Sequence, residues 1–145
     1  MASLESKLRT TAAAYAPLLA LLGSGSPVVF RWYDTTLDEG SVFPAVVVRM
    51  VSNPSAYVTT GRLPTSSARM QFTVWGGQYA GGATAADSVR DALVSWFAQL
   101  NLVGIAGKVM YSNTIVNEMR GVFVQTDKPI YQRIIDAMIL SDDSI

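Results

Sequence analysis

Residues 68–77 of this 145-residue chain read ARMQFTVWGG, and they alternate between apolar and polar side chains. One face of the extended chain would hold Ala68, Met70, Phe72 and Val74, and the other would hold Arg69, Gln71 and Thr73. A period of two is typical of a β-strand with one face in the core. Trp75 closes the predicted strand, and Gly76-Gly77 is expected to stop it.

A helix is predicted directly after this strand. A second glycine pair, Gly81-Gly82, leads to Thr84, and Asp87 follows three residues later, which resembles a capping box. Apolar residues then recur in steps of three and four: Ala86, Val89, Leu93, Trp96, Phe97 and Leu100. This spacing predicts an amphipathic helix of about 16 residues that packs on the sheet.

The remaining elements are expected on both sides of this strand–helix pair. A helix is predicted over residues 3–22, divided at Pro17. Strands are predicted over residues 28–33, 44–51, 108–111, 113–120 and 130–140, with a turn over residues 121–129. The last strand is apolar on both faces, which suits a central strand covered on two sides. We expect one α+β domain over residues 1–145, with a mostly antiparallel sheet and both helices on one face.

The N-terminal segment has features of a signal peptide. Lys7 and Arg9 precede an apolar run, but Glu5 lies among the basic residues and Pro17 divides the run. The run is also shorter than the roughly 20 apolar residues that span a bilayer. We therefore expect a folded helix, a cytoplasmic chain and no membrane partner.

Composition argues for an assembling protein rather than an enzyme. Half of the residues are hydrophobic, only 15% are charged, and the formal net charge is zero. Such a chain has no basic field for DNA or anionic membranes, and its leftover apolar residues are typical of subunit contacts. It has no cysteine and no histidine, so thiolate chemistry and the commonest general base are absent.

Three groups of residues are candidate sites. The glycine pairs lack a P-loop pattern, so a strand-to-helix turn is preferred over a phosphate cradle. A solvated loop is preferred over a divalent-cation site for the carboxylates of Asp34, Asp38 and Glu39. Packing is preferred over a nucleic-acid stacking platform for four aromatic residues, Trp32, Tyr33, Trp75 and Tyr79. No catalytic, cofactor-binding or metal-binding residue is predicted.

Four stretches in order give the chain a family resemblance. They are LLALLG (residues 18–23), FPAVVVR (43–49), ARMQFTVWG (68–76) with the following AADSVRDAL (85–93), and YQRIIDAMIL (131–140). In this order and spacing the chain resembles the tail-terminator, or tail-completion, proteins of long-tailed bacteriophages. Residues 25–41 depart from the family pattern, because this connection is longer and more aromatic.

The resemblance implies a structural virion protein of the tail and neck. Such a subunit forms a homo-hexameric ring on the last ring of tail tube proteins, stops polymerisation, and meets the head–tail connector on its other face. DNA passes through the lumen without specific binding, and assembly takes place in the host cytoplasm.

Ring contacts are expected in the polar segment from Ser52 to Ser67. A ring closes through two different surfaces on each subunit, and exposed strand edges supply such surfaces. We select Tyr57, Arg62 and Leu63 as candidate inter-subunit or tube contacts. An ordinary exposed loop is the equally weighted alternative.

Other functions stay open at this point. The chain could be a different neck component, such as a head–tail adaptor or connector-completion protein. It could also be a non-phage module that binds a ligand through Trp32 and Trp75. An enzyme would have to rely on a carboxylate- or metal-dependent activity, for which Asp34, Asp38 and Glu39 are the candidate residues.

Overall fold

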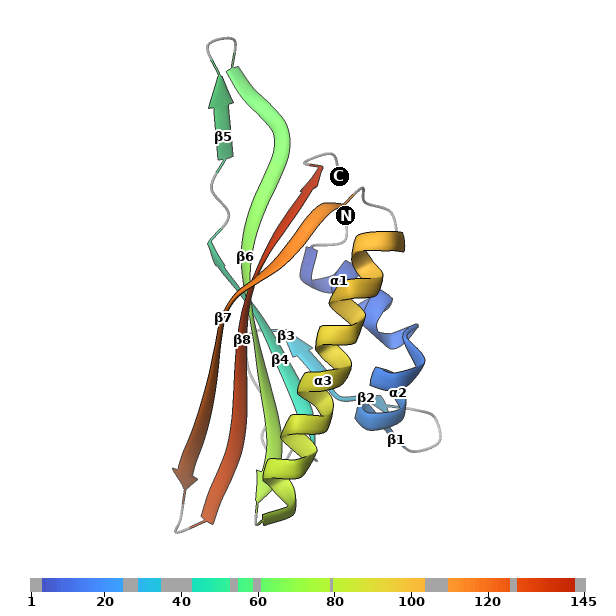
Figure 1. Ribbon diagram of the computed structural model, residues 1–145, viewed down its shortest axis with the longest axis vertical. Coiled ribbons are helices and arrows are strands. Elements are labelled where there is room, and N and C mark those ends of the chain that lie inside the picture. Colours follow the sequence, from blue (N-terminus) through green and yellow to red (C-terminus); the bar gives the residue numbers. More distant parts are fainter. Residues whose placement is uncertain are drawn as a thin grey trace.

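The structure is a computed structural model that describes residues 4–24, 29–34, 43–52, 55–58, 61–78, 80–103, 110–125 and 128–142. In chain order the described elements are α1 (Leu4–Ala13), α2 (Ala16–Leu22), β1 (Gly23–Ser24), β2 (Val29–Phe30), β3 (Trp32–Asp34), β4 (Ala45–Ser52), β5 (Ser55–Val58), β6 (Gly61–Gln78), α3 (Ala80–Val103), β7 (Met110–Gln125) and β8 (Lys128–Asp142). The three helices lie on one side of a long, twisted sheet (Figure 1).

The main sheet has the strand order β3-β4-β6-β8-β7, and β5 pairs with β6 beyond the end of β4. All its pairings are antiparallel except that of β3 with β4. Strands β1 and β2 form a separate small sheet. The predicted α+β class, with a mostly antiparallel sheet and helices on one face, is confirmed.

The core lies between α3 and the helix-facing side of the sheet. The apolar face predicted for residues 68–75 is fully buried, and so is the predicted helix stripe through Phe97. Aromatic rings pack between the two layers. The ring centroids of Trp32 and Trp96 are 5.6 Å apart, those of Phe72 and Phe97 are 5.1 Å apart, and both pairs are edge-on. Edge-to-face rings at such distances stabilise a core beyond their buried area.

The glycine pairs do not form the predicted strand stop and loop. Strand β6 continues through Gly76 and Gly77 to Gln78 with a bulge, where Gly77 adopts a φ of +107°. Helix α3 begins at Ala80, so Gly81 and Gly82 lie inside its first turn and Thr84 is not its cap. A Cβ on Gly76 would lie 2.7 Å from Cβ of Ala86, and one on Gly82 would overlap the carbonyl of Gly77. These glycines therefore allow close contact between strand and helix.

The N-terminal helix is divided as predicted. Its two parts meet at Ala14 and Tyr15, and Pro17 lies in the first turn of α2, where a missing N–H costs little. Arg31 joins this region to the sheet, because its guanidinium donates to the carbonyls of Leu21 at 3.0 Å and Pro44 at 2.7 Å.

The strands near the C-terminus are longer than predicted. The strands expected at residues 108–111 and 113–120 are one strand from Met110 on, β7, which has register shifts near Ser112 and Asn117. Residues 108–109 lie outside the described residues. The turn expected over residues 121–129 is wrong for residues 121–125 and 128–129, which belong to β7 and β8. One strand was expected over residues 28–33. Residues 29–34 instead contain two short strands, β2 and β3, which lie in different sheets.

Only one face of the main sheet is covered by the described helices. Ile135, Ala137 and Ile139 of β8 face α3 and are fully buried. The alternate residues of β8, including Ile134 and Met138, face the other way and are half-buried. No described helix lies on that side (Figure 1). Among the described residues, no second layer of helices covers this face of β8, which differs from the expected cover on two sides. We call this side of the sheet, on which no described helix lies, the open face.

Candidate assembly interface

The open face is a mixed apolar and polar surface. Pairing register places on it, across β4, β6, β8 and β7, residues that include Val47, Arg49, Arg69, Gln71, Thr73, Trp75, Gln132, Ile134, Asp136, Met138 and Met119. Uncharged and apolar groups predominate, and most of them are partly exposed. A sheet face of this composition is typical of a surface that another protein layer covers.

An ion pair lies at the centre of the open face. Nη2 of Arg69 donates to Oδ2 of Asp136 at 2.9 Å, and Asp136 is only 7% exposed. Within the described part of the chain, Oδ1 of Asp136 and Nε of Arg69 are buried without a hydrogen-bond partner. Buried polar atoms normally have partners, so this pair would gain from a donor or acceptor brought by a covering molecule.

Two exposed large apolar residues lie on different sides of the sheet, one on the outer strand β7 and one on β4 beyond the residues that pair with β3. Met119 on β7 and Val51 at the bulge in β4 are each 49% exposed. No other described strand pairs with the outer edge of β7. Unpaired strand edges readily accept a strand from another chain. The two edges differ in sequence and length, so they are two distinct surfaces.

The three predicted contact residues lie on a β-hairpin. Tyr57 belongs to β5, Arg62 and Leu63 belong to β6, and Tyr57 is the register partner of Arg62. The segment from Ser52 to Ser67 is therefore largely strand and not an irregular loop. Strand β8 pairs with β6 only as far as Thr65, so the hairpin extends beyond the rest of the sheet (Figure 1). Backbone pairing thus brings Tyr57 and Arg62 together at a projecting end.

An ionic network joins α3 to β7 on the covered face. Nε and Nη2 of Arg90 donate to the two carboxylate oxygens of Glu118, the latter at 3.0 Å, and Nη1 donates to Asp91 at 2.9 Å. The hydrogen bond from Arg90 holds the pKa of Glu118 below its usual value, and the same contact raises the pKa of Arg90. Such a two-point arginine–carboxylate contact fixes the orientation of both elements.

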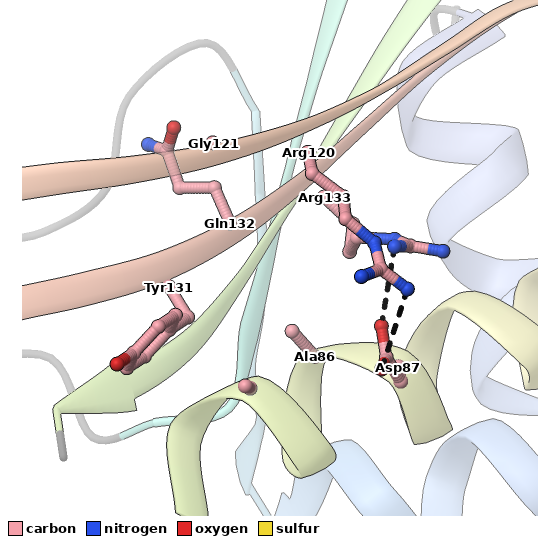
Figure 2. Close-up of a pocket in the computed structure, with 8 residues that line it drawn as sticks. Ala86, Asp87, Arg120, Gly121, Tyr131, Gln132 and Arg133 are labelled. Atoms are coloured by element: carbon pink, nitrogen blue, oxygen red, sulfur yellow. Dashed lines mark ion pairs between the residues drawn. The ribbon is translucent and has the colours of Figure 1, made fainter. Parts of the chain in front are cut away.

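A cavity of about 300 Å³ adjoins this network through Arg133, which lies 3.6 Å from Glu118. It is lined by Ala83, Ala86, Asp87, Arg120, Gly121, Tyr131, Gln132 and Arg133. Figure 2 shows the residues that line the cavity. Arg133 Nη1 lies 3.4 Å from Oδ1 of Asp87, and Arg120 Nη2 lies 4.0 Å from Oδ2. The sequence did not mark this site, because its residues come from α3, β7 and β8 without a common motif.

The other candidate residues do not form a site together. Trp32 is buried against Trp96, whereas Trp75 lies on the open face, so they cannot form one stacking platform. Tyr33 is half-buried in β3, and Tyr79 lies outside the described residues. Asp34 ends β3, but Asp38 and Glu39 also lie outside them. Within the described ranges, no cluster of acidic residues could hold a metal ion.

Comparisons with protein-family models and with curated proteins find no relative of the chain. No protein-family model matches the chain, and no curated protein matches it significantly. Among the described helices, none is long and apolar enough to span a bilayer.

Proposed function

We propose that this chain is a structural subunit of the tail of a long-tailed bacteriophage, which forms a homo-hexameric ring that terminates the tail tube. The observation that carries the proposal is the sheet with one covered face, one open face and two unlike edges. A head-to-tail ring needs two different surfaces on each subunit, and this sheet offers them. The copy number and the tail location come from the family resemblance, which spans most of the chain.

In the ring, the β7 edge of one subunit meets the β4–β5 edge of the next. Met119 then contacts the region around Val51, and both lose their exposure to water. Each side chain is already about half-buried, so covering the rest favours association by about 0.7–1.5 kcal/mol each, half the value for full burial. The projecting hairpin with Tyr57, Arg62 and Leu63 contacts the tube or the connector, because it lies beyond the sheet edge.

The chain acts without catalysis in this proposal and needs no cofactor or metal ion. Its partners are other copies of itself, the tail tube protein and the neck proteins. DNA passes the ring without specific binding, since a neutral subunit has no excess of arginine and lysine to hold phosphates.

Two charge-inserting variants test the head-to-tail contact on purified tail tubes. Met119→Asp and Val51→Asp should each prevent ring formation, because each buries a carboxylate in the contact. An equimolar mixture should give dimers and no rings, since one intact pair of edges remains. Ser95→Asp, on the exposed side of α3, is the matched control and should form rings. Rings from both single variants would refute this arrangement.

Electron microscopy separates the terminator from another neck component. A terminator should cap one end of bare tail tubes and stop their elongation. Binding to connectors but not to tubes would instead identify a head–tail adaptor or connector-completion protein.

A further inference from the structure

The cavity between α3 and the β7–β8 pair contains an arginine whose hydrogen bonds are incomplete. The side chain of Arg133 is only 13% exposed. Its closest charged partners are Asp87 at 3.4 Å and Glu118 at 3.6 Å, and among the described residues nothing accepts a hydrogen bond from its Nε. Charge-assisted hydrogen bonds are normally about 2.7–2.9 Å long, and a guanidinium cannot lose its charge to relieve burial.

The surrounding groups offer little to complete these bonds. Glu118 is already held at both oxygens by Arg90. Asp87 is shared between Arg133 and Arg120, and the contact to Arg120 is 4.0 Å long. The side chain of Arg120 is 77% exposed and adjoins the same cavity. Two guanidinium groups from neighbouring strands therefore border a space of about 300 Å³ (Figure 2).

From this geometry we infer that the cavity binds a carboxylate group carried on a short apolar body. The guanidinium forks of Arg133 and Arg120 hold the carboxylate, since a planar fork matches its two oxygens. Ala83 and the ring of Tyr131 lie against the apolar body. The inference concerns a ligand site and does not depend on the proposed ring.

Charge selects a carboxylate over a phosphate dianion. The ionised residues that line the cavity are Arg120, Arg133 and Asp87, which sum to one positive charge. A monoanion balances this charge, whereas a dianion would leave a negative excess beside Asp87 and close to Glu118. The exposed arginine at the rim also gives the ligand an approach from solvent.

Sodium butyrate is the probe, and the Nε–Hε signals of the arginines are followed by NMR at constant ionic strength. We expect butyrate to shift the Arg133 signal in a saturable way. Arg133→Lys and Arg120→Lys keep the charge but lose the fork, and each should weaken binding about tenfold or more. Arg49→Lys, on the open face, is the matched control and should bind as the unaltered chain does.

A cavity-filling variant separates binding from folding. Ala83→Leu should abolish the butyrate-induced shift of the Arg133 signal while the chain still unfolds cooperatively. Arg120→Lys should keep the fold, because the side chain of Arg120 is exposed. The inference would be overturned if butyrate did not shift the Arg133 signal, or if Arg49→Lys weakened butyrate binding as much as the cavity variants do. Tighter binding of inorganic phosphate than of butyrate would also overturn it.

A capped tripeptide with one central glutamate distinguishes two sources of the carboxylate. Tighter binding of the peptide than of butyrate supports an acidic side chain of a protein partner. Equal or weaker binding supports a small organic acid in the same site.

Discussion

Gly76 and Gly82 set the distance between β6 and α3 at the scale of single residues. Each lies where a Cβ would meet backbone atoms of the other element. Gly81 is adjacent to Gly82, yet a Cβ there would have no atom within 4 Å. Substitution by alanine is therefore expected to be unfavourable at Gly76 and Gly82 and favourable at Gly81.

We predict that Gly76→Ala and Gly82→Ala lower the free energy of unfolding by about 1–3 kcal/mol or more, because backbone cannot move aside as a side chain can. Gly81→Ala should raise it by up to about 1 kcal/mol, because alanine favours a helix. Urea-unfolding midpoints measure both effects. Equal effects at Gly81 and Gly82 would contradict the close contact.

The sequence predicts the core better than it predicts these glycines. The alternation of residues 68–75 and the helical spacing from Ala86 to Phe97 identify buried side chains, because each face needs only local periodicity. A glycine pair, in contrast, looks the same in a loop and in a tight contact. Only the tertiary position of Ala86 distinguishes the two.

At the scale of elements, the pair Arg90–Glu118 fixes α3 against β7. Its hydrogen bonds hold the pKa of Glu118 below its usual value. A carboxylate with a lowered folded-state pKa contributes stability above its unfolded pKa, about 4.3. This stability is lost as the pH falls through the lowered folded-state value.

We predict that Glu118→Gln lowers the free energy of unfolding by about 0.5–1 kcal/mol at pH 7, since the pair is partly exposed. The difference from the unaltered chain should shrink as the pH falls below about 4. Asp91→Asn removes the more exposed partner of the same arginine and should cost less. Urea titrations at pH 3 to 7 measure this, and a pH-independent difference would contradict the role of the ion pair.

Element existence follows from the sequence, whereas strand length does not. Strands β6, β7 and β8 continue through residues read as turns, including Gly76-Gly77 and Gly121. Long antiparallel neighbours supply hydrogen bonds that outweigh the local preference of glycine. The hairpin with Tyr57 and Arg62 was not predicted from the sequence, because its polar residues are equally typical of a loop.

At the scale of the whole molecule, the described helices cover the sheet on one side only. The helices cover the face of Phe72 and Ile135, and the face of Ile134 and Met138 stays open. Sequence periodicity indicated that both faces of β8 are apolar. It could not show that the described helices all pack on the same one of these faces. The open face and the two unlike edges are the surfaces that the proposed self-assembly would cover.

The most direct test is the mass of the purified protein with and without tail tubes, measured by light scattering and negative-stain microscopy. We predict six-fold rings, or density that caps one end of each tube and limits its length. A monomer that ignores tubes and leaves their length uncontrolled would contradict the account.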